Sequence, residues 1–117
     1  MKFTEHLKKN RQFQAVYKDG KSCANRYFVM FVLKNNLEIN RLGISVSKKV
    51  GNSVVRHRIK RLVNESYRLH ENEFNSGLDI VILARNSANG IDYKDTESAV
   101  LHLGRLHRIV YNNEDSL

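Results

Sequence analysis

The chain has 117 residues, of which 41% are hydrophobic; lysine and arginine number 20 against 12 acidic residues, a net charge of +8. This length fits a single domain over residues 1–117 with one core, ending in a flexible tail at 112–117. The sequence contains no apolar run of about 18 residues, so it predicts no membrane-spanning helix. The charged start does not resemble a secretory leader. The lone Cys23 cannot form an internal disulfide, so we expect a cytoplasmic protein.

The first predicted element is a short helix that Asn10 can cap and that Gly20 can end. Its apolar side chains recur at the spacing of one helix face: Phe13, Val16 and Tyr17.

Two strands are predicted next. The continuous apolar run at 27–33 is typical of a central strand covered on both faces, and the polar run at 34–40 supplies a turn. From 42 to 47 apolar residues alternate with glycine and serine, which predicts a strand with one buried face.

A second helix follows, and either Asn52 or Ser53 can cap it. Its predicted apolar stripe consists of Val55, Ile59, Leu62, Ser66 and Leu69. At about 100° per residue, the opposite side carries His57, Lys60, Arg61 and Arg68. Arg56 and Arg58 flank the stripe.

The apolar run at 78–84 predicts a buried strand, and Asp92 with Asp95 begins a final helix. Its expected inward side chains are Ala99, Val100, Leu103, Leu106 and Val110. The order helix, strands, helix, strand, helix indicates an α+β fold in which three helices pack on a small sheet of about four strands.

The positive charge is concentrated in one segment. Residues 41–68 hold eight basic side chains and one acid, a local charge of +7: Arg41, Lys48, Lys49, Arg56, Arg58, Lys60, Arg61 and Arg68 against Glu65. Such an excess indicates a polyanionic partner, because guanidinium groups match phosphate oxygens bidentately and lysines act as mobile point charges. The alternative is a solvated helix face that only improves solubility. A membrane surface is disfavoured, because the segment lacks a wide aromatic and leucine face.

An aromatic set stands beside this basic segment. If the first helix lies along the sheet, Phe13, Tyr17 and Phe31 line one groove, and aromatic rings can stack on unpaired bases. The alternative for these three residues is ordinary core packing.

The run SVSKKVGNSVVRHRIKRLVNES at 45–66 resembles the signature of the bacterial ribonuclease P protein subunit, roughly S-x-K-x-G-N-A-V-x-R-N-R-x-K-R-x-x-R-E. The stretch at 13–32 resembles the same family's F-x-x-V-F/Y-x-x-G…A-N-x-x-F region, and IVILAR at 80–85 its third block. The resemblance covers roughly residues 5 to 110.

This resemblance implies a ribosomal-protein-like fold with a left-handed crossover around the basic helix. It also implies a cofactor subunit that binds a large catalytic RNA, which itself carries the catalytic site and removes 5′ leaders from precursor tRNA. No catalytic protein residue is therefore expected. Mg²⁺ would be held mainly by the RNA, and neither a membrane nor DNA would be a partner.

Carried over by position, the RNA-facing residues are Arg56, Arg58, Lys60 and Arg61, to which we add His57, Arg68, Lys48, Lys49 and Asn52 as RNA-binding candidates. The leader cleft would be lined by Phe13, Tyr17 and Phe31, with Lys48, Lys49 and Asn52 near it. Two residues depart from the family pattern: His57 replaces an asparagine, and Asn64 replaces an arginine that would add a cation.

The histidines are scattered and no zinc-binding spacing occurs, so no metal site on the protein is predicted. Two further hypotheses stay open. One is a ribosomal or general structured-RNA-binding protein without a role in cleavage; the other is a helix-turn-helix DNA binder that reads with residues 53–71.

Overall fold

The computed structural model describes residues 1–111, so the predicted tail at 112–117 lies outside the described residues. In chain order the elements are β1 (Thr4–His6), α1 (Asn10–Asp19), β2 (Lys21–Ala24), β3 (Phe28–Lys34), β4 (Asn40–Ser45), α2 (Ser53–Leu69), the short 3₁₀ helix η1 (Glu71–Glu73), β5 (Leu78–Ala84), the 3₁₀ helix η2 (Asn86–Ala88) and α3 (Tyr93–Leu106). The α+β class and the three α-helices are confirmed, whereas the described sheet has five strands rather than about four.

The strands form one sheet in the order β1-β4-β5-β3-β2. β4 runs parallel to both β1 and β5, and β3 runs antiparallel to both β5 and β2. Since β4 and β5 are parallel neighbours joined through α2, this connection is a crossover. Its left-handed sense stays a prediction from the family resemblance.

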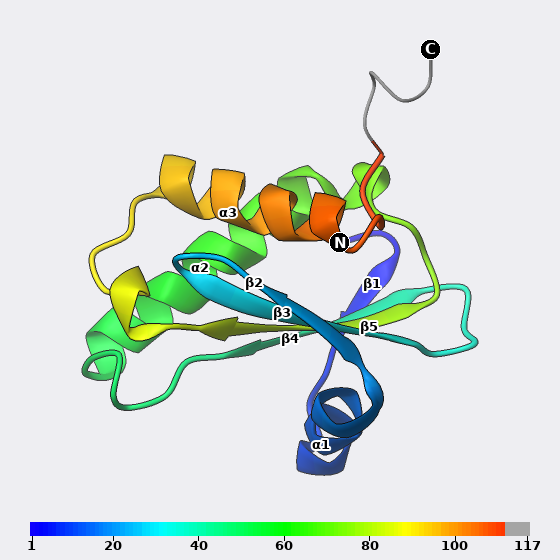
Figure 1. Ribbon diagram of the computed structural model, residues 1–117, viewed down its shortest axis with the longest axis horizontal. Helices are drawn as coiled ribbons and strands as arrows, with labels where there is room; N and C mark the ends of the chain where they lie inside the picture. Colours follow the sequence, from blue (N-terminus) through cyan, green and yellow to red (C-terminus); the bar gives the residue numbers. More distant parts are fainter. Residues whose placement is uncertain (112–117) are drawn as a thin grey trace.

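The helices cover the sheet unequally. α1 packs alone on one face, and α2 and α3 lie together on the other (Figure 1). Successive side chains of a strand point to opposite faces, so β5 supplies both layers. Leu78, Ile80 and Ile82 enter the large core under α2 and α3, whereas Val81 joins the small core under α1.

The helix boundaries follow from local hydrogen bonds. Asn10 is the first residue of α1 rather than its cap. The cap is Lys9, and the backbone N–H of Lys9 donates to Oε1 of Gln12 at 3.2 Å. Gly20 ends α1 as predicted, and its N–H donates to the Val16 carbonyl at 2.9 Å. Asp92 caps α3 as predicted, since its side chain accepts from the N–H of Asp95 at 2.8 Å.

The predicted apolar stripe of α2 is rotated relative to the observed one. The buried residues are Ile59, Val63, Ser66 and Tyr67, while Leu69 is exposed. The prediction followed one stripe of apolar residues that recur every three or four positions, and it therefore missed Tyr67. Because α2 packs against both the sheet and α3, its buried face is wider than one such stripe. α3 likewise ends at Leu106, which is exposed, and Val110 lies beyond the helix.

A buried polar centre joins β1, β4, β5 and α2. The Asn40 side-chain amide donates to the Asn75 carbonyl at 2.7 Å and to Oη of Tyr67 at 3.1 Å, and its oxygen accepts from the N–H of Leu78 at 2.9 Å. The Tyr67 hydroxyl also shares a hydrogen bond with Thr4 at 2.8 Å. These bonds fix the short strand β1, which the sequence pattern did not predict, beside β4.

Candidate nucleic-acid interface

The basic helix α2 is held at its start by a side-chain cap. Asn52 accepts from the N–H of Val55 at 3.0 Å, and its own carbonyl accepts from the N–H of Arg56 at 2.9 Å. Asn52 is therefore the predicted cap, and its side-chain oxygen is already used in the fold. An exposed side chain in this position still leaves its amide N–H₂ free to face a ligand.

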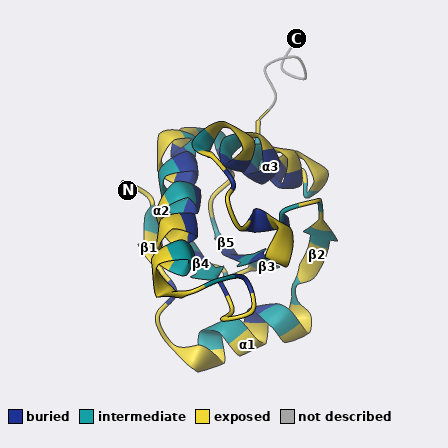
Figure 2. Cartoon of the chain, turned by 90° about the vertical axis from the view of Figure 1, so that its left-hand side faces the viewer, coloured by how far each residue is buried: buried dark blue, intermediate teal, exposed yellow. Residues whose placement is uncertain are grey.

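The predicted cations of α2 lie mostly in solvent. Among the RNA-binding candidates the exposed side chains of this helix are His57, Arg58, Lys60, Arg61 and Arg68. Figure 2 shows exposed residues along the outer side of α2 and buried ones where it meets α3 and the sheet. A row of exposed cations on one helix side is a surface suited to phosphates.

Not every cation on this surface is equally available. Arg68 pairs with Glu65 through two hydrogen bonds of 2.5 and 3.1 Å, and this contact lowers the pKa of Glu65 and raises that of Arg68. Arg58 donates from Nη1 to the carbonyl of Ile91, at 2.5 Å, and so ties α2 to the chain before α3. Within residues 1–111, neither Lys60 nor Arg61 makes such a hydrogen bond or ion pair, so these two side chains present their charge most directly.

Arg41 and Arg56 differ from the other members of the basic segment. Arg41 is bidentate to the buried Asp79, with both contacts at 2.7 Å, so its charge is neutralised inside the fold. The pKa of Arg41 is accordingly raised, first by its hydrogen bond to Asp79. Arg56 is half-buried, and its Nε atom is buried with no hydrogen-bond partner in the described part of the chain.

The two lysines of the predicted site precede α2. Lys48 and Lys49 are both exposed, in the turn that joins β4 to the helix, where the N–H of Val50 donates to Ser47 at 3.1 Å. The Asn89 side chain also donates to the Val50 carbonyl, at 2.9 Å. The backbone of this turn is therefore fixed while its lysine side chains extend into solvent.

Phe13, Tyr17 and Phe31 lie together on the α1 face of the sheet, while their lining of one leader groove stays a prediction. The ring centroids of Phe13 and Tyr17, both on α1, are 6.4 Å apart, and Phe31 on β3 lies edge-on to Tyr17 at 5.0 Å. All three are half-buried and pack on the small core formed by Leu7, Val16 and Val81. We call these three aromatic residues the aromatic row. The row is partly core and partly surface, so the two sequence-based alternatives are not exclusive.

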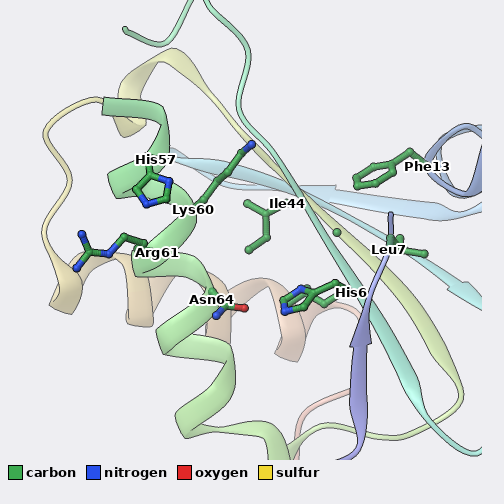
Figure 3. A pocket seen from close by; sticks show the side chains of 10 residues that line it. His6, Leu7, Phe13, Ile44, His57, Lys60, Arg61 and Asn64 are labelled. Carbon is green, nitrogen blue, oxygen red and sulfur yellow. The ribbon is translucent and has the colours of Figure 1, made fainter. Parts of the chain in front are cut away.

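A pocket of about 310 Å³ lies between Phe13, the one member of the aromatic row that lines it, and the basic helix. Phe13 lines one wall, and His57, Lys60, Arg61 and Asn64 of α2 line the other (Figure 3). β1 and β4 complete it through His6, Leu7, Leu42, Gly43 and Ile44. The cations of α2 and the end of the aromatic row therefore border one continuous hollow.

Sequence reasoning missed several residues of this hollow. His6 gave no signal, because β1 has only three residues and no clear alternation. Gly43 did carry one: a glycine inside a strand pattern indicates a bulge or a close approach. Asn64 was noted only as the loss of a cation, although its side chain lines the pocket.

In the described residues, no group of three or more His, Cys, Asp or Glu side chains is placed to hold a metal ion. Among residues 1–111, no helix is long and apolar enough to cross a membrane. α2 follows strand β4 directly, so the described residues lack the preceding short helix that a helix-turn-helix motif requires.

Comparisons with known proteins agree on one family. The family model described as Ribonuclease P matches residues 1–107. The ribonuclease P protein component of Lachnoclostridium phytofermentans is 61% identical over 111 residues, covering 95% of this chain and 96% of that one. The corresponding protein of Alkaliphilus metalliredigens is 49% identical over 110 residues, with 94% and 99% covered.

The fold comparison gives the same result. The RNase P protein of Staphylococcus aureus superposes with a TM-score of 0.84 at 36% identity, covering 91% of this chain and 97% of that one. The RNase P protein of Thermotoga maritima gives 0.79 at 34% identity, with 86% and 96% covered. A long basic signature, the sheet order and near-full-length similarity thus coincide in one molecule, and the chain belongs to the bacterial ribonuclease P protein family.

Proposed function

We propose that this protein component of ribonuclease P binds the catalytic RNA through α2 and the 5′ leader of precursor tRNA through the aromatic row. The holoenzyme removes the leader and leaves the mature tRNA 5′ end. The observation that carries this proposal is the pocket that the exposed cations Lys60 and Arg61 share with Phe13, whose ring packs on Tyr17 and through it on Phe31.

The α2 surface supplies affinity for folded RNA. Lys60 and Arg61 are exposed on α2, and the exposed Lys48 and Lys49 extend the positive surface ahead of the helix. Phosphate neutralisation by such side chains releases counterions and strengthens binding at low salt. Arg58 and Arg68 add charge while they also hold local structure.

The aromatic row supplies a surface for unpaired nucleotides. Base–aromatic stacking contributes about 1–3 kcal/mol per base and tolerates sequence changes, because every base has a π-face. A leader differs in sequence from one precursor to another, so this mode of binding suits it.

Catalysis belongs to the RNA in this proposal. α2 carries one acid, Glu65, and Arg68 already occupies it, so the donor set of this surface does not fit a resident Mg²⁺. RNA phosphates are the ligands we assign to Mg²⁺, and the protein's cations would lower the Mg²⁺ concentration that folding and cleavage require. The proposed compartment is the bacterial cytoplasm, which the unpaired Cys23 fits.

The test is 5′-leader cleavage of a precursor tRNA by a bacterial ribonuclease P RNA at low Mg²⁺, with and without this protein. We expect strong activation by the wild type and weak activation by the Lys60→Ala/Arg61→Ala variant. The matched control, Lys34→Ala/Arg105→Ala, removes equal charge from exposed positions outside α2 and should activate normally. A folded protein that binds RNA but leaves cleavage unchanged would favour the structured-RNA-binding alternative.

A further inference from the structure

A second hollow lies between α2 and the start of α3. Its volume is about 480 Å³, and we call it the Tyr93 hollow after the first residue of α3. The residues that line it are Arg58, Arg61, Leu62, Asn64, Glu65 and Tyr93. Its α2 residues are displaced by one position from those of the pocket beside Phe13, which turns the two spaces about 100° apart around the helix. Arg61 lines both, and Figure 3 shows its side chain extending from α2 away from Phe13, whereas Lys60 extends toward it.

A chain of side-chain hydrogen bonds fixes the Tyr93 ring in this hollow. The Tyr93 hydroxyl donates to Oε2 of Glu97, one turn further along α3, at 3.0 Å. The same carboxylate oxygen bonds to Nε2 of His70 at 2.9 Å, and Nδ1 of His70 pairs with Glu73 of η1. Since the hydroxyl is engaged within the fold, the half-buried ring is the part of Tyr93 that a ligand can contact. A ring already held in one orientation loses little conformational entropy on binding.

The lining of the Tyr93 hollow is positively charged. Arg58 and Arg61 are exposed, and Glu65 is the acid among the lining residues. Both oxygens of Glu65 already accept from Arg68, at 2.5 and 3.1 Å, so this acid is neutralised. Arg58 donates from Nη1 to the Ile91 carbonyl, which holds its guanidinium near the start of α3. The other N–H groups of the guanidinium can still donate to a phosphate.

A fixed aromatic ring next to two arginines suits an unpaired nucleotide. Bases stack on aromatic side chains, and guanidinium groups match phosphate oxygens bidentately. The half-buried Leu62 adds apolar surface to the same hollow. Oδ1 of Asn64 is out of contact with solvent and both Glu65 oxygens are engaged, so these acceptors do not read the edge of a base. The hollow is therefore expected to accept a base of any identity.

The position of the hollow favours the catalytic RNA over the leader. The aromatic row lies on the α1 face of the sheet, whereas α3 lies with α2 on the opposite face (Figure 1). A leader stacked on the aromatic row would have to pass around α2 to reach Tyr93. We propose that the Tyr93 hollow binds one unpaired nucleotide of the catalytic RNA, with its base stacked on Tyr93 and its phosphate held by Arg58 and Arg61. This inference rests on the proposed function, which places the catalytic RNA on α2.

The test compares variants of the full-length protein in equilibrium binding to a bacterial ribonuclease P RNA. Tyr93→Leu removes the ring, whereas Tyr93→Phe keeps the ring and removes only the hydroxyl bond to Glu97. Tyr111→Leu is the matched control, because Tyr111 is exposed and lies outside the hollow. We expect Tyr93→Leu to bind about 5- to 150-fold more weakly, the range for loss of one stacked base. Tyr93→Phe and Tyr111→Leu should bind like the wild type.

The comparison of the two Tyr93 variants separates stacking from a structural role. Both lack the hydroxyl bond to Glu97, so only the ring distinguishes them. Equal affinity of Tyr93→Leu and Tyr93→Phe, whether both match the wild type or both bind weakly, overturns the stacking site.

A second measurement begins with the wild-type protein and so does not depend on how a variant folds. Acylation of ribose 2′-hydroxyl groups is mapped along the catalytic RNA and the precursor tRNA in the assembled holoenzyme, because a nucleotide fixed in the hollow loses reactivity. We expect one unpaired nucleotide of the catalytic RNA to be protected by the wild type and by Tyr93→Phe, and to recover its reactivity with Tyr93→Leu. An abasic residue at that nucleotide should weaken wild-type binding by the same factor and leave Tyr93→Leu binding nearly unchanged.

The outcomes separate this site from the proposed function. Tyr93-dependent protection found in the leader alone overturns the assignment to the catalytic RNA. Activated cleavage without any Tyr93-dependent change in binding or protection overturns the site and leaves the proposed function standing. A wild-type protein that gives no activation and does not bind the catalytic RNA overturns both.

Discussion

The ring of Phe13 lies directly against Gly43 of β4: a Cβ built on Gly43 would be 2.6 Å from two ring carbons. The aromatic row and the strand edge are therefore in contact through a residue that has no side chain. Gly43→Ala should turn the Phe13 ring away and weaken precursor binding relative to mature tRNA binding. The free energy of unfolding should change by less than about 1 kcal/mol, because alanine suits a strand better than glycine does.

Equilibrium binding of both RNAs, with denaturant unfolding of the variant, checks this prediction. A large loss of stability with unchanged RNA discrimination would show that Phe13 is held as core rather than as binding surface.

Phe31 provides the second test of the aromatic row. It is half-buried and lies edge-on to Tyr17 at 5.0 Å. Phe31→Ala should lower the affinity for precursor tRNA by about 1–3 kcal/mol if one leader base stacks on this row. Mature tRNA, which lacks the leader, is the control ligand and should bind nearly as before. An equal loss for both RNAs would contradict leader stacking.

Lys60 and Arg58 should respond differently to truncation. Lys60→Ala removes an exposed cation, so the slope of log affinity against log salt should fall by about 0.7–0.9 for one lost phosphate contact, with stability unchanged. Arg58→Ala should also reduce stability by about 1–2 kcal/mol, because Arg58 bonds to the Ile91 carbonyl. Salt titrations and thermal unfolding of both variants measure the difference; identical effects on stability would argue against the Arg58 contact.

His70 makes the stability of the α2–α3 contact depend on pH. Its Nδ1 pairs with Glu73 and its Nε2 with Glu97 at 2.9 Å; burial lowers the pKa of His70, but the two carboxylates outweigh it and the net shift is upward. This stabilisation is therefore complete below the unfolded pKa of about 6.5 and is lost as pH rises through the folded value. The wild type should lose more stability than His70→Gln between about pH 6 and pH 9 in urea unfolding. Parallel curves for the two proteins would contradict the pairing.

Asn40 tests the buried polar centre. Asn40→Ala removes three hydrogen bonds and leaves the Leu78 N–H and the Asn75 carbonyl without these partners. Each buried group left unsatisfied costs about 1–3 kcal/mol, so we expect a loss of several kcal/mol in unfolding free energy. Asn72→Ala, at an exposed position, is the control and should be nearly neutral.

The strongest apolar patterns predicted the central strands of the sheet correctly, whereas the short strands β1 and β2 were not predicted. The run at 78–84 coincides with β5, because a strand buried on both faces needs continuous apolar residues. β1 and β2 have three and four residues, too few for periodicity to stand out, and long-range pairing rather than local pattern makes them strands.

The sequence predicted many residues of the candidate site but not how the fold brings them together. The signature indicated the exposed cations of α2, and the helix spacing brought Phe13 and Tyr17 together. The pocket between them depends on β1 ending before β4 does, which no local pattern encodes. The engagement of Arg41 by Asp79 was also invisible, because the two residues are far apart in sequence.

The strand order has a consequence for synthesis of the chain. β5 lies between β4 and β3, although it is the last strand to be made. Until Ala84 has left the ribosome, the β2–β3 hairpin and the β1–β4 pair lack the strand that joins them. The large core then also lacks the apolar side chains that β5 supplies. Folding of this subunit is therefore expected to begin only near the end of translation, so shortened chains that stop before β5 would be substrates for proteolysis rather than for RNA assembly.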